Sequence, residues 1–166
     1  MAKKIAIYPG SFDPFTNGHL DILHRALQIF DHVIVALTTA ASKNPLFSDE
    51  ERLFMLREIT RDLPNVSVAI FNGLLVDYSR QKKAVAIIRG LRVVSDFEYE
   101  FQMALMNRKL SQQKNKSKIL EMVYLMPDEK YTYLSSTLVK EIAKLNGDVS
   151  SFVPKIVGEK LKKKFL

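Results

Sequence analysis

The chain contains no cysteine among its 166 residues. Disulfide bonds, thiolate metal sites and cysteine nucleophiles are therefore excluded, and the absence fits a reducing compartment. Apolar runs are also short, because none approaches the roughly 18 residues that a membrane span requires. The segment before Pro9 and Gly10 is too short for the charged and apolar regions of a signal peptide. We therefore expect a cytoplasmic protein without a membrane partner.

The length and a hydrophobic content of 47% suit one domain over residues 1–166, with a core that needs no crosslinks. The net charge of +7 favours a polyanionic partner, such as nucleic acid, an acidic membrane or a phosphorylated small molecule. Much of this charge lies in two clusters, which we interpret as solvated surface segments. They are Arg108, Lys109, Lys114, Lys116 and Lys118, and Lys160, Lys162, Lys163 and Lys164.

Short apolar segments alternate with segments of helical periodicity along the chain. Strands are expected at 5–8, 33–38, 66–71, 85–88 and 119–126. Helices are expected at 20–30, 48–61, 75–82, 95–110, 135–145 and from 154 onward. The S-x-x-E patterns at Ser48 and Ser95 predict capping boxes, and Gly147 predicts a helix stop. The alternation predicts an α/β fold with a Rossmann-like, doubly wound sheet of five parallel strands, in a single domain with C-terminal helices.

In such a sheet, ligands bind beyond the carboxyl ends of the strands. The first expected strand is followed there by a turn rich in glycine and proline, P-G-S-F-D-P-F-T-N-G-H at residues 9–19. Thr16 or Asn17 can cap the next helix, whose N-terminus attracts anions. Neither G-x-x-x-x-G-K-[ST] nor G-x-G-x-x-G occurs, which disfavours a P-loop or an NAD site.

His19 falls in the first turn of that helix, where the helix dipole lowers the imidazole pKa. Either protonation state can donate a hydrogen bond to a phosphate oxygen. A partly buried structural histidine is the alternative interpretation. A phosphate site is favoured because Gly18 allows a ligand close to the backbone at the same place.

The fourth expected strand runs into R-G-L-R at residues 89–92. Arginine has forked donors that match phosphate oxygens. The alternative is an ion pair with one of the acids that follow, Asp96, Glu98 or Glu100. These acids are typical of a helix N-terminus, and we do not expect them to form a metal cage, because Mg²⁺ usually arrives on nucleotide phosphates.

Two further segments follow strand ends. Lys43 comes after the second expected strand, and its sequence context alone does not separate it from an exposed surface lysine. Residues 130–137, K-Y-T-Y-L-S-S-T, offer hydroxyls and helix-start amides, and so predict a second anion site or a simple helix cap.

These motifs together resemble those of a known family. T-N-G-H at residues 16–19 is similar to the T/H-x-G-H motif of the nucleotidyltransferase superfamily. The runs Y-P-G-S-F-D-P, I-R-G-L-R and L-S-S-T-L-V-K resemble signatures of bacterial phosphopantetheine adenylyltransferases. The four motifs occur in the family's order, and the resemblance extends from residue 4 to about residue 153. The sequence departs from the pattern at Ser11, Leu134, the lysine-rich loop 111–118 and the basic tail.

The resemblance implies transfer of AMP from ATP to 4′-phosphopantetheine, giving dephospho-coenzyme A and pyrophosphate, with Mg²⁺ carried on the phosphates. It implies catalytic roles for His19, Lys43 and Arg92. It implies that the second substrate is bound by Ser11, Lys43, Leu75 and Arg89. The implied ATP site comprises Ser11, Phe12, His19, Gly90, Leu91, Arg92, Glu100, Tyr131, Thr132, Tyr133, Leu134, Ser135, Ser136 and Thr137. A homohexamer and feedback by coenzyme A are further implications.

Three alternatives remain. Another transferase of the superfamily could act on nicotinamide mononucleotide or a cytidylyl substrate. A basic nucleic-acid-binding module is disfavoured because the lysine clusters lack interleaved aromatic residues, so we expect no nucleic-acid partner. A non-catalytic nucleotide-binding protein is disfavoured by the candidate catalytic histidine.

Overall fold

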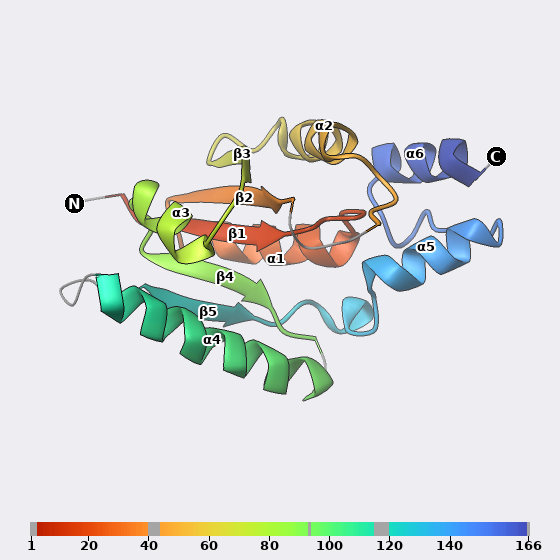
Figure 1. Ribbon diagram of the computed structural model, residues 1–166. Helices are drawn as coiled ribbons and strands as arrows, with labels where there is room; N and C mark the ends of the chain where they lie inside the picture. The colour runs from red at the N-terminus through yellow and green to blue at the C-terminus, as the bar shows by residue number, and fades with distance from the viewer. Residues whose placement is uncertain (1–2, 40–43, 93, 115–119, 166) are drawn as a thin grey trace.

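The computed structural model describes residues 3–39, 44–92, 94–114 and 120–165 (Figure 1). Its centre is a five-stranded sheet in the order β3-β2-β1-β4-β5, in which every neighbouring pair is parallel. The strands are β1 (Ile5–Gly10), β2 (His32–Thr38), β3 (Val66–Phe71), β4 (Ala86–Gly90) and β5 (Glu121–Leu125). This order confirms the predicted doubly wound α/β fold, with the change of direction between β1 and β4.

Six α-helices and a short 3₁₀ turn surround the sheet in the part of the chain that the structure describes. The helices are α1 (Asn17–Leu27), α2 (Asp49–Thr60), α3 (Leu75–Gln81), α4 (Val94–Lys114), α5 (Ser136–Lys144) and α6 (Lys155–Phe165). The 3₁₀ turn, η1 (Glu129–Tyr131), lies between β5 and α5. Within the same described ranges, no helix is long and apolar enough to cross a membrane.

The central strands β1, β2 and β4 are largely buried on both faces, as expected for nearly continuous apolar runs, whereas the edge strands β3 and β5 are more exposed. Alternate side chains of β2 enter different clusters: Val35 packs with α1 and α2, whereas Ile34 packs on the side of α3. On that second side, α4 also contributes, through Leu110 near Ile87 of β4. Helices α5 and α6 pack with α2 in a separate cluster beyond the strand ends, as Figure 1 shows.

The helix starts follow their capping residues. Thr16 caps α1 and Ser48 caps α2, each within a complete capping box, and Ser135 caps α5. The predicted box at Ser95 is wrong, because α4 already begins at Val94 and Ser95 lies inside the helix. A Ser-x-x-Glu pattern occurs inside helices as well as at their starts, so the pattern alone did not locate this boundary.

One helix end differs from the prediction in position, and another in the residue that forms it. Helix α4 runs to Lys114 rather than stopping near Leu110, because the residues between are good helix formers. Helix α5 ends where expected, but Asn146, not Gly147, takes the left-handed conformation, with φ of 59°. Gly147 is required for space instead, since a Cβ there would lie 2.5 Å from the Ile142 side chain.

Candidate active site

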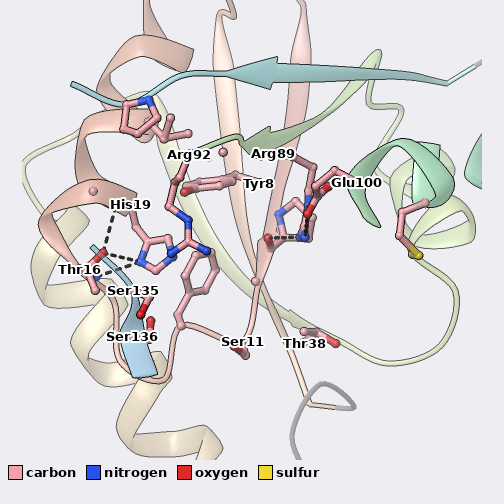
Figure 2. Close-up of a pocket in the computed structure, with 18 of the residues that line it drawn as sticks. Tyr8, Ser11, Thr16, His19, Thr38, Arg89, Arg92, Glu100, Ser135 and Ser136 are labelled. Carbon is pink, nitrogen blue, oxygen red and sulfur yellow. Dashed lines mark hydrogen bonds and ion pairs between the residues drawn. The ribbon is translucent and has the colours of Figure 1, made fainter. Parts of the chain in front are cut away.

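A pocket of about 570 Å³ opens at the carboxyl ends of the strands (Figure 2). Its walls come from the β1–α1 turn, the ends of β2, β3 and β4, one side of α4, and the start of α5. Loops from both sides of the β1/β4 switch point therefore meet at one site. This is the position at which open α/β sheets bind ligands.

The imidazole of His19 is fixed by the cap of its own helix. The backbone N–H of Thr16 donates to His19 Nδ1 at 3.0 Å, and the Thr16 hydroxyl lies 3.0 Å from the same atom. The His19 backbone N–H in turn donates to Thr16 Oγ1 at 3.3 Å. Because Nδ1 accepts the backbone hydrogen bond, the ring proton of a neutral imidazole is on Nε2.

The electrostatic surroundings keep this imidazole neutral. Burial, together with the positive charges of Arg92 and Arg89, lowers the pKa of His19 to about 4. The direction agrees with the sequence-based expectation, and burial and arginine charge are causes that the sequence did not indicate. Near pH 7 the site thus holds a neutral ring with an Nε2–H donor.

Arg89 and Glu100 form a charged pair in the wall of the pocket. The Arg89 Nε and Nη2 atoms donate to the Glu100 carboxylate at 3.0 and 2.5 Å, and Glu100 is only 6% exposed. Arg89 Nη1 also lies 3.4 Å from the Pro9 carbonyl. Of the ion-pair partners considered from sequence, Glu100 is in direct contact with Arg89. The pair leaves Arg89 oriented and its charge partly balanced.

Arg92 comes from the same strand end but points toward the other side of the pocket, beside the imidazole (Figure 2). Its Nη1 donates to the Leu134 carbonyl at 2.8 Å, which ties β4 to the segment before α5. Both arginine charges act on Tyr8, whose pKa burial raises strongly in spite of them. The phenol of Tyr8 is therefore neutral and adds no negative charge to the pocket.

The start of α5 forms the wall that faces His19. Ser135 Oγ accepts the Leu138 N–H at 3.1 Å, and the Ser136 hydroxyl donates to the Pro14 carbonyl at 2.7 Å. The first amides of a helix lack intrahelical acceptors, so this wall can hold an anion. Capping and anion binding, the two interpretations drawn from the sequence, are compatible at this helix.

Most of the residues predicted for the site line this pocket. They are Ser11, Phe12, His19, Leu75, Arg89, Gly90, Arg92, Glu100, Tyr131, Leu134, Ser135, Ser136 and Thr137. Three described residues, Leu91, Thr132 and Tyr133, are not among the lining residues, and Tyr133 is 83% exposed. Lys43 lies outside the described residues, so its place in the site stays a prediction.

Sequence reasoning missed several side chains of the pocket wall. They include Tyr8, Thr38, Phe71, Met103, Asn107 and Met122. Apart from Tyr8, which adjoins the first turn, they belong to elements whose proximity depends on strand order. No local motif marks them.

A dedicated metal cage does not fit the described part of the chain, where no group of three or more histidine and acidic side chains is arranged to hold a metal ion. Among the described residues that line the pocket, Glu100 is the one carboxylate, and it is engaged with Arg89. A cation that entered with a polyphosphate would therefore find its oxygen ligands mainly on that ligand.

Comparisons with known proteins agree with this geometry. Residues 7–142 match the family described as Cytidylyltransferase-like. The chain is 55% identical over 162 residues to a phosphopantetheine adenylyltransferase of Caldanaerobacter subterraneus subsp. tengcongensis, covering 98% of each chain. It is 54% identical over 161 residues to one of Alkaliphilus metalliredigens, covering 97% of this chain and 99% of the relative.

Two solved structures share the fold. One, described as a nicotinate-nucleotide adenylyltransferase from Vibrio parahaemolyticus, has a TM-score of 0.67 at 19% identity, over 99% of this chain and 95% of that one. The other, a lipopolysaccharide core biosynthesis protein from Thermoplasma volcanium, has a TM-score of 0.56 at 20% identity, over 76% and 99%. At these identities the likeness concerns the fold alone.

The fold, the capped imidazole at the switch point and the match over residues 7–142 define a nucleotidyltransferase of the cytidylyltransferase-like class. The identity to curated relatives extends over nearly the full chain. Within that class, the chain belongs to the phosphopantetheine adenylyltransferase family.

Proposed function

We propose that the protein transfers the adenylyl group of ATP to 4′-phosphopantetheine, producing dephospho-coenzyme A and pyrophosphate. The observation that carries the proposal is a single pocket that joins a neutral, oriented imidazole to two arginines and a helix start. The 55% identity to a phosphopantetheine adenylyltransferase supports the choice of substrates.

The reaction needs no protein nucleophile. A phosphate oxygen of 4′-phosphopantetheine attacks the α-phosphorus of ATP, and the bond from that phosphorus to the oxygen bridging it to the β-phosphate breaks. Pyrophosphate leaves with the bonding electrons. Holding two polyanions in line is the main task, and such positioning is worth roughly 7–11 kcal/mol of barrier.

His19 is proposed to stabilise the transition state. Its Nε2–H would donate to a non-bridging oxygen of the α-phosphate, where negative charge increases as the new bond forms. Because the pKa of His19 is lowered to about 4, the donor is a neutral imidazole over the physiological range. Arg92, beside the ring, would offset the charge of the triphosphate.

The second substrate is proposed to bind through its phosphate at Arg89 and Lys43, with Ser11 between the two ligands and Leu75 against the pantetheine arm. Of these residues, Ser11, Leu75 and Arg89 line the pocket. Three predicted ATP ligands do not line the pocket, namely Leu91, Thr132 and Tyr133. We propose that ATP would contact them at the rim of the pocket. Mg²⁺ bound to the phosphates would neutralise charge and assist the leaving group.

A pyrophosphate-release assay tests the function directly. Purified protein with ATP and Mg²⁺ should release pyrophosphate only when 4′-phosphopantetheine is added, and mass spectrometry should find dephospho-coenzyme A. Nicotinamide mononucleotide and a cytidylyl substrate serve as competing acceptors. Release with either of these, and none with 4′-phosphopantetheine, would overturn the proposal.

The proposal extends to a cytoplasmic homohexamer that is inhibited by coenzyme A. Helix α4 supports assembly, because Phe97, Phe101, Leu105 and Met106 are each at least half exposed and repeat at helical spacing. Gel filtration with light scattering tests the hexamer, and cell fractionation tests the location. Coenzyme A contains both the pantetheine arm and an adenylate, so inhibition should be competitive at this pocket.

A further inference from the structure

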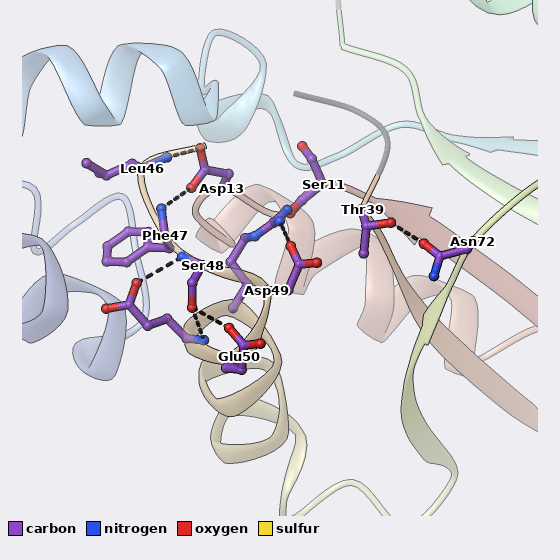
Figure 3. A network of polar contacts seen from close by, with 11 residues as sticks. Ser11, Asp13, Thr39, Leu46, Phe47, Ser48, Asp49, Glu50 and Asn72 are labelled. Atoms are coloured by element: carbon purple, nitrogen blue, oxygen red, sulfur yellow. Dashed lines mark hydrogen bonds and ion pairs between the residues drawn. The ribbon is translucent and has the colours of Figure 1, made fainter. Parts of the chain in front are cut away.

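The β1–α1 turn is held from outside by buried charged side chains (Figure 3). On one side, Arg52 of α2 is 2% exposed and donates through Nη1 to the Ser11 carbonyl at 2.6 Å. Its other terminal nitrogen pairs with Asp49. The backbone of Ser11, a pocket residue, is thereby tied to the helix on its far side.

On the other side of the turn, Asp13 collects three donors from two distant segments. Its Oδ1 accepts the Phe47 N–H at 3.0 Å, and its Oδ2 accepts the Leu46 N–H at 2.9 Å. Oδ2 also pairs with the ammonium group of Lys140, from α5, at 2.9 Å. The Asp13 side chain is 3% exposed and is not among the residues that line the pocket.

The Asp13–Lys140 pair connects two walls of the pocket. The turn that contains Asp13 continues into the cap of α1, where Thr16 orients His19. The helix that contains Lys140 begins at Ser136, whose hydroxyl donates to the Pro14 carbonyl. The two anion-binding helix starts of the site are therefore linked outside the pocket by one ion pair and one hydrogen bond.

The surroundings of Asp13 favour an ionised carboxylate. Burial alone would raise the pKa of Asp13, but the hydrogen bonds from Leu46, Lys140 and Phe47 outweigh it and hold the pKa below its ordinary value. Buried ion pairs often add little net stability compared with apolar packing. What such a pair does supply is directional contact with three donors at once, which fixes their relative positions.

We propose that Asp13 is a positioning residue that, through Lys140, Leu46 and Phe47, sets the α5 wall of the pocket at the distance from His19 that adenylyl transfer requires. The inference rests on the proposed function, since it assumes that both walls hold one nucleotide. A change at Asp13 should then alter the rate of the chemical step more than the binding of either substrate. A misplacement of about 1 Å can cost about a hundredfold in rate.

The test uses three single variants, one double variant and one control in the full-length protein. Asp13→Asn keeps the side-chain shape but removes the charge and one acceptor. Lys140→Met removes the cation, and Lys140→Arg keeps one. Lys144→Met, on the exposed side of the same helix, is the matched control. The kcat and the KM for ATP and 4′-phosphopantetheine are measured well below the Tm of each variant.

We expect kcat to fall about tenfold to a hundredfold in Asp13→Asn and Lys140→Met, with smaller changes in KM. Lys140→Arg should recover most of the rate, Lys144→Met should match wild type, and the Asp13→Asn/Lys140→Met double variant should lose no more than the worse single variant. If Asp13→Asn does not fold, the three lysine variants decide the question.

Lower Tm values with unchanged kcat would assign a purely structural role to the pair and overturn the inference. So would additive losses in the double variant, or an equal loss in Lys144→Met. A wild-type protein that releases no pyrophosphate would instead overturn the proposed function. The two failures are therefore distinguishable.

Discussion

Helices α1 and α2 begin with the same capping box, but the two boxes end in different side chains. In α2, Glu51 accepts the Ser48 N–H at 2.9 Å and pairs with Lys164 at 3.0 Å. In α1, His19 accepts the Thr16 N–H at 3.0 Å and opens onto the pocket. One box completes a helix, whereas the other completes a helix and also orients an imidazole that lines the pocket.

The difference lies in the hydrogen-bonding capacity that each side chain retains after one of its polar atoms has formed the cap. A carboxylate has only acceptors, so beyond the cap Glu51 can pair with a cation or accept a further hydrogen bond but cannot donate one. A neutral imidazole has one acceptor and one donor, so the cap uses Nδ1 and leaves the Nε2–H for a ligand. The comparison teaches that the spacing of the T-N-G-H motif is the spacing of a helix cap.

The largest expected effect is on catalysis by His19→Ala. Loss of the Nε2–H donor should lower kcat roughly 10²–10³-fold, the usual cost of removing one transition-state donor, with a much smaller change in ATP affinity. Steady-state assays and ATP titration measure both. Glu51→Ala is the matched control and should keep the wild-type kcat; a folded His19→Ala protein with normal kcat would contradict the assigned role.

His19→Gln separates the two functions of the α1 box. Glutamine at this position of a capping box can accept a hydrogen bond from the Thr16 N–H. The free energy of unfolding of His19→Gln should therefore lie closer to the wild-type value than that of His19→Ala. Its activity should stay well below wild type, because the amide does not reproduce the geometry of the imidazole. Urea denaturation and the pyrophosphate assay measure the two quantities; parallel recovery of both would show that the cap alone limits the rate.

The next effect comes from the capping hydroxyls. Thr16→Val and Ser48→Ala should each lower the free energy of unfolding by about 0.5–2 kcal/mol. Only Thr16→Val should also lower kcat, by about tenfold if the hydroxyl contributes about 1.4 kcal/mol to orienting the ring. Equal effects of the two substitutions on kcat would remove the distinction between the boxes.

Acid should weaken both caps, over different ranges. The pKa of His19 is lowered from 6.5 to about 4, so its contribution to stability is complete above pH 6.5 and is lost as the pH falls toward 4. The Ser48 N–H lowers the pKa of Glu51 below 4.5, so the contribution of Glu51 is lost only at more acidic pH. Urea unfolding against pH for His19→Gln and Glu51→Gln measures each range.

The free enzyme's NMR spectrum gives a direct check of the same pKa. The His19 ring signals, assigned by their loss in His19→Gln, should titrate with a midpoint near 4. A midpoint near the ordinary 6.5 would mean that the ring is charged or solvated in the resting site.

The smallest effect is expected at the surface end of the α2 box. Lys164→Ala removes the partner of Glu51, and partly exposed ion pairs contribute about 0–1 kcal/mol. The loss should shrink further in high salt, and kcat should not change. A loss of activity here would mean that the α2 box is coupled to the site.

Local patterns were enough to predict the elements and the polar centre of the site. Strand and helix periodicity, the Ser48 box and the glycine-flanked His19 all depend on residues close in sequence. The order of the strands does not depend on neighbouring residues alone. That β5 pairs with β4 and not with β2 is decided by contacts between segments far apart in the chain. The boundary of α4 was missed for a related reason, since a capping pattern does not say whether a helix has already begun.

The partners of the charged residues were the least predictable part. The sequence left the arginines of this segment with three acidic candidates, and the contact between Arg89 and Glu100 became visible only in the fold. Asp13 and Lys140, which form an ion pair, are 127 residues apart in the sequence. The residues around each of them contain no pattern that predicts this pair. Two causes of the lowered His19 pKa were also not predicted, because burial and the approach of two arginines are properties of the assembled pocket.

The pair between Arg89 and Glu100 has a consequence for turnover. The guanidinium already has a resident anion, so a substrate phosphate that binds at Arg89, as proposed above, would have to share or displace that anion. Its net affinity would then be the difference between two similar contacts rather than the full strength of one. We therefore expect a phosphate to be aligned there without being held tightly, which would favour departure of a product that is itself still phosphorylated.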